Sequence, residues 1–421
     1  MSLLEPRTRA LAIIVIVAAA VVAVAQAAPR TGLISKTSAG EPADGHSHLG
    51  QPDALSGSGR FVVFESRADN LPGGDGVNQQ VYVRDTRTDR TRLVSRDGQG
   101  GPIPWTNVVG GISANGRFIA FRSAGAGLPQ ANGQEQVWLY DRRRDKTRLV
   151  SKDNSGAPGD LGSFDPSVSA TGRFVVFASS ATNLPGATSG EGRVYVRDLK
   201  RRRTIVASKT PGDAPTTGGL YGQTISADGR RVTFYSSHAD LPGTGGVDQH
   251  VYVRDLDRRR TLLVDRTRGG AIFENESYNS SISGNGRFVI FEHGSVGSNQ
   301  IYVRDLKRKR TRLAGRNSAG QPQSGYGEFA HLSGSGRYAV FVSDAANLPG
   351  GDGLTSLTYV RDLKRGKTRL ASKAAGGVPA DSEATNAAIS QDGRWVGFDS
   401  GADNLGGNTS VIQVFRAGPA R

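Results

Sequence analysis

The chain has 421 residues, and its 53 Lys and Arg against 38 Asp and Glu give a formal net charge of +15. It contains no cysteine, which excludes a disulfide framework and a lipid-anchored cysteine. Its 36% hydrophobic content and its 57 glycines, many of them at turn positions, are typical of a folded extracellular protein rather than of a disordered or collagen-like chain.

Residues 1–27 predict a secretory signal peptide. Arg7 and Arg9 precede an apolar run over residues 11–24, and Ala25 and Ala27 supply the small residues of a cleavage site. The run is too short for a comfortable membrane span, although retention as an uncleaved anchor stays open. We therefore expect a secreted or periplasmic protein with no membrane span after cleavage.

After this segment one unit recurs seven times. Each copy has the turn Ser-x-x-Gly-Arg and a phenylalanine four residues after that arginine. A fixed period indicates an array in which each unit buries its apolar face on its neighbours, so residues 28–421 are expected to form one domain. Successive turn glycines are separated by 57, 56, 57, 57, 50 and 57 residues and are Gly59, Gly116, Gly172, Gly229, Gly286, Gly336 and Gly393.

Within one unit the residue pattern is that of strands. In the third copy, residues 173–178 are β-branched and aromatic, residues 193–198 alternate polar and apolar side chains, and residues 204–208 form a further run after a charged turn. Residues 167–169 add a short strand before the turn. Four antiparallel strands per repeat predict a propeller blade, and seven repeats predict an all-β, seven-bladed β-propeller.

The two ends of the repeat region predict how the ring closes. The last copy stops near residue 417 without an outer strand, whereas residues 31–36 match residues 147–152, which follow the charged turn of the second copy. We therefore expect residues 31–35 to be the fourth strand of the seventh blade, which pairs the last sheet edge.

The repeat resembles the TolB-like propeller family, the WD-repeat-like blades of exported bacterial proteins. The resemblance is carried by residues 226–234 (Ser-Ala-Asp-Gly-Arg-Arg-Val-Thr-Phe), 251–256 (Val-Tyr-Val-Arg-Asp-Leu) and 261–264 (Thr-Leu-Leu-Val), and it extends over residues 31–417. It implies the propeller fold. For function it implies a protein-binding scaffold, a sugar-binding module or a lid on a larger enzyme.

Blade geometry predicts two different faces. The short turns between the third and fourth strands share one face and are basic, which favours a polyanion such as an anionic cell-envelope polymer. The alternative is that these are solvated hairpin tips with no ligand. Nucleic acid is not favoured, because stacking aromatics are absent from these turns. The predicted basic residues are Arg142, Arg143, Arg144, Arg201, Arg202, Arg203, Arg258, Arg259, Arg260, Lys307, Arg308, Lys309 and Arg310.

The opposite face carries long, variable loops with aromatic and polar residues that could stack on sugar rings or grip a peptide. The alternative is that one aromatic per blade seals the gap to its neighbour. The candidate ligand-binding residues are His48, Trp105, Phe164, Asp165, Tyr221, Tyr278, His293, Tyr326 and Glu328.

The fifth repeat is seven residues short, because Phe291 and Tyr302 are 11 residues apart where Phe64 and Tyr82 are 18 apart. This copy lacks the Leu-Pro loop of the others. We expect a notch in the long-loop face beside Tyr278, Glu292 and His293.

The sequence predicts no catalytic residue and no metal ligand. The pair His46 and His48 lacks a third ligand nearby, and Gly45-His-Ser-His48 fails the nucleophile-elbow pattern. Asp75 and Asp352 in the Leu-Pro loops leave a structural calcium ion open, but a turn built on Asn, Gly and Pro explains these loops as well.

The sequence therefore favours a monomeric, non-catalytic binding or scaffold module whose partner is a protein or an anionic cell-envelope polymer. The alternative is a propeller-type polysaccharide lyase or glycoside hydrolase that uses acids such as Asp165 and Glu328.

Overall fold

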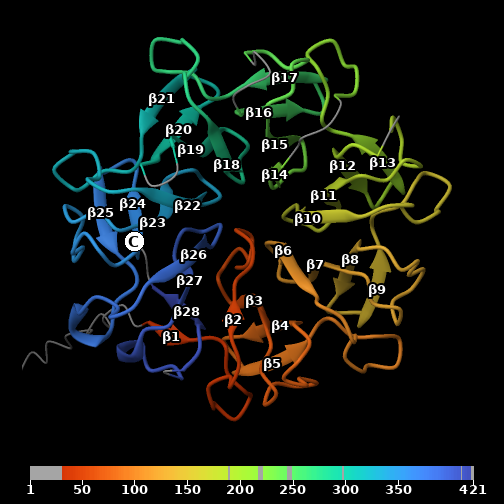
Figure 1. Cartoon of the computed structure of the whole chain (residues 1–421), viewed down its shortest axis with the longest axis horizontal. Coiled ribbons are helices and arrows are strands. Elements are labelled where there is room, and N and C mark those ends of the chain that lie inside the picture. The colour runs from red at the N-terminus through yellow and green to blue at the C-terminus, as the bar shows by residue number, and fades with distance from the viewer. Residues whose placement is uncertain are drawn as a thin grey trace, which may run out of the picture.

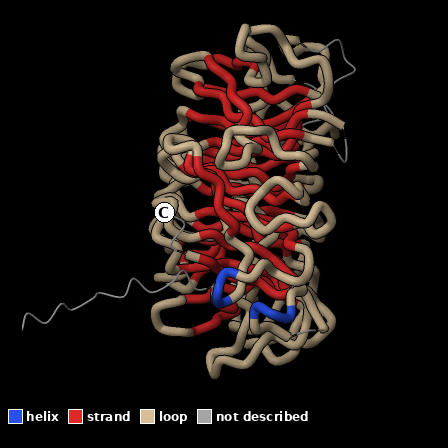
Figure 2. The backbone as a smooth tube through the Cα atoms, turned by 90° about the vertical axis from the view of Figure 1, so that its left-hand side faces the viewer, coloured by secondary structure: helices blue, strands red, loops and turns tan. Residues whose placement is uncertain are grey.

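The computed structural model describes residues 31–187, 190–216, 221–243, 249–295, 298–408 and 410–418, so the predicted signal peptide lies outside the described residues. Seven antiparallel sheets of four strands each are arranged around a central axis (Figure 1). Seen edge-on, the ring is a flat disc with loops on both faces (Figure 2). The predicted all-β, seven-bladed propeller is confirmed.

Blades one to three follow one another in chain order, each from the innermost to the outermost strand. Blade one is β2 (Ser47–His48), β3 (Phe61–Ser66), β4 (Gln80–Asp85) and β5 (Arg90–Leu93). Blade two is β6 (Val108–Ile112), β7 (Phe118–Ser123), β8 (Gln136–Asp141) and β9 (Lys146–Leu149). Blade three is β10 (Ser163–Val168), β11 (Phe174–Ser179), β12 (Arg193–Asp198) and β13 (Arg203–Val206).

Blades four to six repeat this order. Blade four is β14 (Tyr221–Ile225), β15 (Arg231–Ser236), β16 (His250–Asp255) and β17 (Arg260–Leu263). Blade five is β18 (Ser277–Ile282), β19 (Phe288–His293), β20 (Gln300–Asp305) and β21 (Arg310–Leu313). Blade six is β22 (Gly327–Leu332), β23 (Tyr338–Ser343), β24 (Leu357–Asp362) and β25 (Lys367–Leu370).

Blade seven joins the two ends of the described chain. It contains β26 (Ala384–Ile389), β27 (Val396–Ser400) and β28 (Gln413–Ala417), and its outer strand is β1 (Gly32–Leu33), drawn in red beside the blue β28 in Figure 1. Gly32 pairs with Arg416 and Leu33 with Phe415. The predicted closure by the N-terminal strand is confirmed. Two short 3₁₀ turns, Ala375–Gly377 and Asp403–Leu405, are the only helical segments described.

The core lies between the blades. The second and third strands are buried on both faces because a neighbouring blade packs on each side, which explains their continuous apolar runs. The repeated phenylalanine stacks on the repeated tyrosine of the next strand, as Phe64 does on Tyr82 at 5.5 Å. At the axis one aliphatic residue per blade narrows the channel, and the remaining cavity there is only about 30 Å³. These residues are Leu55, Ile112, Val168, Ile225, Ile282, Leu332 and Ile389.

The turn glycines are required by contacts between blades. Gly116 has φ +68°, and a Cβ atom there would lie 2.3 Å from the ring of Phe61 in the preceding blade. Equivalent aromatic rings cover the turn glycines of the other blades, except that Arg231 replaces the aromatic residue beside Gly286. Within a blade, the turn between the first and second strands lies beside the hairpin between the third and fourth strands, where the Thr86 N–H donates to the Arg60 carbonyl at 2.9 Å. These turns and hairpins share one face, here called the hairpin face. The other connections form the long-loop face.

Candidate functional site

The hairpin face carries the predicted basic residues, and the acids beside them are already paired. Asp198 accepts two hydrogen bonds from Arg173, at 3.0 and 2.6 Å. Asp305 accepts two from Arg287, at 2.9 and 2.6 Å. Burial opposes ionisation of Asp198, but the arginine and two backbone N–H groups outweigh it and lower the pKa of this carboxyl. In blades three and five the aspartate at the base of the hairpin is thus held by the arginine of the turn and not by the cations at the hairpin tip.

The predicted basic residues differ in whether packing or salt bridges already hold their side chains. Arg142 is packed, because its guanidinium lies 3.8 Å from the centre of the Phe61 ring and donates to the Gly116 carbonyl. In blade four, Arg258 pairs with Asp255 at 3.2 Å and Arg259 pairs with Asp213. The remaining predicted cations are exposed and have no salt bridge to any described carboxylate: Arg143, Arg144, Arg201, Arg202, Arg203, Arg260, Lys307, Arg308, Lys309 and Arg310.

A cleft of about 1150 Å³ surrounds the outer strand β21 of blade five. In blade one the Leu-Pro loop lies against the outer strand, where a Cβ atom on Gly73 would be 2.9 Å from Leu93. Blade five lacks that loop, and its Tyr302 and Leu313 line the cleft instead. Half of the other lining residues are cations, which are Arg268, Arg287, Arg308, Arg310, Arg312, Arg316, Arg337, Arg361 and Lys364.

On the long-loop face, five predicted ligand-binding residues occupy equivalent places near the start of the innermost strands. His48, Phe164, Tyr221, Tyr278 and Glu328 each pair across the sheet with the residue that directly follows the repeated phenylalanine. In blades one to seven these partners are Glu65, Arg122, Ala178, Tyr235, Glu292, Val342 and Asp399. Sequence reasoning missed this second position. Its signal is that it differs between blades while the phenylalanine before it is constant.

Blades five and six bring acids and tyrosines together at this position. Glu292 is 1% exposed, and burial raises its pKa to about 8, with the charge of Glu328 adding to the effect. The Asn279 amide donates to Glu292 at 3.2 Å. Burial also raises the pKa of Tyr278, and Glu292 and Glu328 act on it in the same direction. The raised pKa favours the protonated form of Glu292 at pH 7.

Blade one, together with blade seven, holds a second cluster of titratable side chains at the equivalent position of the long-loop face. His48 Nδ1 lies 3.5 Å from the buried Asp399, and this contact raises the pKa of His48. Glu65 is also buried, which raises its pKa to about 7. Glu65 accepts a hydrogen bond from the Val109 backbone at 3.1 Å, and Asp399 accepts one from Leu49 at 3.0 Å. These carboxyls therefore bind the backbone of the next blade as well as facing the long-loop side.

The other candidates lie apart from this ring. His293 packs 4.2 Å from Phe273, which comes from the connection before blade five. The predicted open notch is thus wrong, because Phe273 covers His293 while Tyr278 and Glu292 face blade six. Trp105 is 47% exposed in a loop, Tyr326 bonds to Ser356, and the Asp165 carbonyl accepts from Gln223 at 2.7 Å.

Metal-binding geometry is not found among the residues that the structure describes, where no three His, Asp or Glu side chains are grouped to hold an ion. The Asp75 and Asp352 carboxylates accept backbone N–H groups within their own loops. His46 accepts from the Ile412 backbone at 3.1 Å. In the described ranges, no helix has the length and apolar character needed to cross a membrane.

Comparison with known proteins identifies the fold only. No family model matches the chain, and no curated protein matches it. An oligogalacturonate lyase in complex with manganese is 14% identical, with 93% of this chain and 96% of that chain covered and a TM-score of 0.55. The oligogalacturonate lyase from Vibrio parahaemolyticus is 12% identical, with coverages of 93% and 97% and a TM-score of 0.55.

Two further solved structures are also similar to this chain. The propeller domain of the Trilobed protease from Pyrococcus furiosus is 10% identical over 89% of this chain and 94% of that chain, with a TM-score of 0.54. TolB from Acinetobacter baumannii is 13% identical over 88% and 84%, with a TM-score of 0.43. The propeller part of the predicted TolB-like resemblance is confirmed, whereas the family itself stays a prediction, since a propeller hosts many functions.

Proposed function

We propose that this propeller is a non-catalytic binding module that acts outside the cytoplasm and holds an anionic cell-envelope polymer on its hairpin face. The observation that carries the proposal is the set of exposed, unpaired cations at equivalent hairpins of blades two, three and five. Because the hairpins occupy the same place in blades one to six, their charges add on one face.

This arrangement suits a long, repetitive ligand. Separate hairpins can each contact one charged group along a polymer, so that many weak contacts combine. Arginine side chains can hold phosphate or carboxylate groups with two hydrogen bonds each. A partner protein with an acidic surface would meet the same cations, and the test therefore includes an acidic protein.

The proposal is tested by co-sedimentation of the protein, from residue 31 onward, with purified anionic cell-wall polymer. We expect binding that weakens steeply with salt and is reduced when Arg201, Arg202 and Arg203 are replaced by serine. Equal retention of wild type and variant at all salt concentrations would contradict the proposal. Binding of the acidic protein in preference to the polymer would replace the polymer by a protein as partner.

A second candidate is a polysaccharide lyase or glycoside hydrolase, favoured by one observation. Glu292 has a pKa of about 8 and lies in electrostatic range of Glu328, which is the pairing of a proton donor with a carboxylate that such chemistry uses. Release of new sugar chain ends from an acidic polysaccharide, lost in Glu292→Gln, would support it. Unchanged polymer length after long incubation would exclude it for that substrate.

A further inference from the structure

Five of the seams between blades share one polar contact, in which the arginine before the aspartate of the third strand reaches the segment that leads in from the preceding blade; these arginines are Arg84, Arg197, Arg254, Arg304 and Arg361. Arg84 is 1% exposed, and its Nη1 donates to the Thr37 carbonyl and to Thr91 Oγ1, both at 2.8 Å. Arg361 does the same in blade six, where Nη1 donates to the Arg316 and Asn317 carbonyls at 2.9 Å and to Thr368 Oγ1 at 2.7 Å. Each such seam thus encloses at least one guanidinium.

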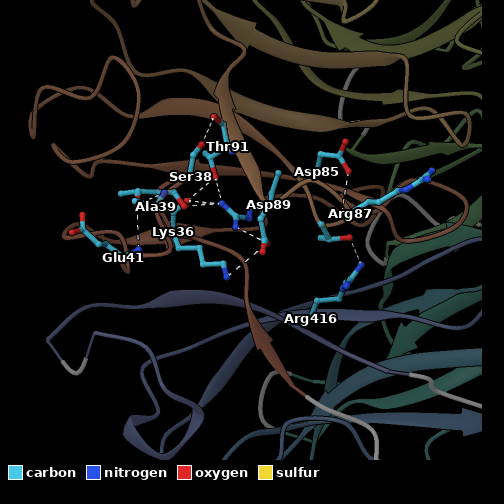
Figure 3. Close-up of polar contacts among 12 residues, drawn as sticks. Lys36, Ser38, Ala39, Glu41, Asp85, Arg87, Asp89, Thr91 and Arg416 are labelled. Carbon is cyan, nitrogen blue, oxygen red and sulfur yellow. Dashed lines mark hydrogen bonds and ion pairs between the residues drawn. The ribbon is translucent and has the colours of Figure 1, made fainter. Parts of the chain in front are cut away.

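Most seams also provide a carboxylate near these cations. Between blades seven and one, Asp89 contacts Arg84 at 2.8 Å and Lys36 at 3.9 Å (Figure 3). Between blades one and two, Asp145 pairs with Arg96 and accepts from Tyr140. At the next three seams a carboxylate also acts on the seam arginine. Asp213 forms an ion pair with Arg254. Burial lowers the pKa of Arg197 and Arg304, and the charges of Asp153 and Asp265, respectively, oppose that shift.

The seam between blades five and six has the cations, but the connection that leads into blade six, residues 314–326, contains no Asp or Glu, and the hairpin of blade six has only Asp362. Arg312, Arg316 and Arg361 line the cleft together. Burial lowers the pKa of Arg361, and the charges of Arg316 and Arg312 lower it further, whereas the charge of Asp362 opposes them. The aspartates nearest to them, Asp305 and Asp362, are held by Arg287 and Arg337 with paired hydrogen bonds. No described carboxylate forms a salt bridge with Arg312, Arg316 or Arg361.

The missing acid can be located by comparing the hairpins. Asp89 and Asp145 occupy the left-handed position of their hairpins, with φ of 55° and 56°, and the equivalent residue of blade six is Gly366, with φ of 71°. A Cβ atom on Gly366 would lie 3.8 Å from Arg361 Nη2 and would meet nothing closer. A carboxylate at residue 366 would therefore stand beside Arg361, as Asp89 stands beside Arg84.

We propose that the seam between blades five and six is an oxyanion site, in which a phosphate or carboxylate group enters the cleft and takes the place that Asp89 fills between blades seven and one. The inference rests on the proposed function, because the group would belong to the same anionic polymer, but it assigns a discrete site rather than a charged face. A cleft of about 1150 Å³ is larger than most small-molecule sites, so a group carried on a larger molecule can enter it.

The physical argument is electrostatic. Three guanidinium groups held together by the fold repel one another, and an oxyanion among them relieves that repulsion while it accepts hydrogen bonds. Arg312 is partly desolvated, which lowers its pKa, and its Nη1 donates to the Leu363 carbonyl at 3.0 Å. A guanidinium that the protein already orients loses less conformational entropy when it binds an anion.

The test compares two substitutions of one residue. Gly366→Asp supplies the acid from within the chain, and Gly366→Asn has nearly the same shape without the charge; Asp and Asn both tolerate the left-handed conformation. Calorimetric titration with inorganic phosphate, polyphosphate and polyglutamate separates a free phosphate from phosphate or carboxylate groups on a polymer. We expect Gly366→Asn to bind within about twofold of wild type and Gly366→Asp to bind at least about tenfold more weakly.

A second pair of variants keeps the test independent of folding at residue 366. Arg312→Gln should weaken binding of the same probes, whereas Arg92→Gln, at the equivalent position of blade one, should not. Wild-type affinity in Gly366→Asp or in Arg312→Gln would overturn the oxyanion site, as would failure of the wild type to bind any of the three probes at low salt.

Failure of this inference can be distinguished from failure of the proposed function. Serine substitution of Arg201, Arg202 and Arg203, which do not line the cleft, should leave inorganic phosphate binding unchanged and weaken polymer binding. Loss of polymer binding in that variant, with Gly366→Asp like wild type, would keep the charged face and remove the seam site. The opposite pattern would keep the seam site and remove the face.

Discussion

Arg60 and Asp85 form a two-point ion pair, with Nε to Oδ1 at 2.8 Å and Nη2 to Oδ2 at 2.7 Å, which ties the turn between the first two strands of blade one to its third strand. The pair recurs at Arg117 with Asp141, and at Arg173, Arg287 and Arg337 with the corresponding aspartates. In these five blades the arginine that follows the turn glycine is thus a structural residue of the hairpin face, whereas in blade four Arg231 forms the pair with Asp255. The cations available to a ligand are the exposed hairpin arginines and lysines that form no salt bridge.

The first prediction concerns acid stability. Burial opposes ionisation of Asp85, but its bonds to Arg60 and to nearby backbone outweigh that effect and lower its pKa to about 2. A carboxyl with a lowered folded pKa contributes stability above its unfolded pKa of about 4, and this contribution is lost as the pH falls toward 2. Asp85→Asn should therefore melt a few degrees below wild type at pH 7, and the gap should close near pH 2. A gap that stays constant in melting curves across this range would contradict the assignment.

The second prediction compares two turn glycines. Gly116 and Gly286 both have positive φ, at +68° and +66°, so alanine is strained at both. Only at Gly116 would the new methyl group meet an aromatic ring, at 2.3 Å, whereas beside Gly286 the nearest atom is Arg231 Cδ at 3.4 Å. Gly116→Ala should therefore cost about 1–3 kcal/mol more free energy of unfolding than Gly286→Ala. Equal losses in denaturant titrations would show that the aromatic contact does not matter.

The third prediction concerns ring closure. A chain that begins at residue 37 lacks β1 and leaves the β28 edge, including the Val414 carbonyl that accepts from Ile34 at 2.8 Å, without its partner. It should melt well below a chain that begins at residue 31 and should self-associate through the open edge. Coincident melting curves and monomeric elution of both chains would contradict the role of β1.

The fourth prediction concerns the long-loop face. Because burial raises the folded pKa of Glu292 to about 8, its contribution to stability is complete below an unfolded pKa near 4.5 and is lost as the pH rises through 8. Wild type should therefore lose stability relative to Glu292→Gln between pH 6 and pH 9. A difference in melting temperature that does not change over this interval would show that Glu292 is ionised in the folded protein.

The sequence predicted the fold because its periodic signals are also its structural ones. The glycine and phenylalanine of each repeat set the turn and the core contact, the arginine sets the ion pair in five of the blades, and all three recur at fixed spacing. The closing strand was predicted for the same reason, since residues 31–36 copy a segment whose neighbours were already assigned.

The candidate sites were less predictable, because their residues are defined by departures from the repeat. Glu292 and Asp399 occupy a position that is Ala178 in blade three and Val342 in blade six, so no shared pattern marks them. The acids of the seams come from unrelated positions, such as a hairpin for Asp89 and an interblade loop for Asp213. Only the folded ring shows that both act on the buried arginine at the equivalent position of two blades, Arg84 and Arg254.

The central claim, that unpaired hairpin cations bind a polyanion, is tested most directly by a matched pair of variants. Arg201 and Arg202 occupy the same hairpin positions as Arg258 and Arg259, but only the second pair is held by aspartates. The measurement is the slope of log affinity for anionic cell-wall polymer against log salt concentration, in Arg201→Ser/Arg202→Ser and in Arg258→Ser/Arg259→Ser. We predict a shallower slope and weaker binding in the first variant and near wild-type behaviour in the second; equal effects of the two variants, or none, would contradict the account.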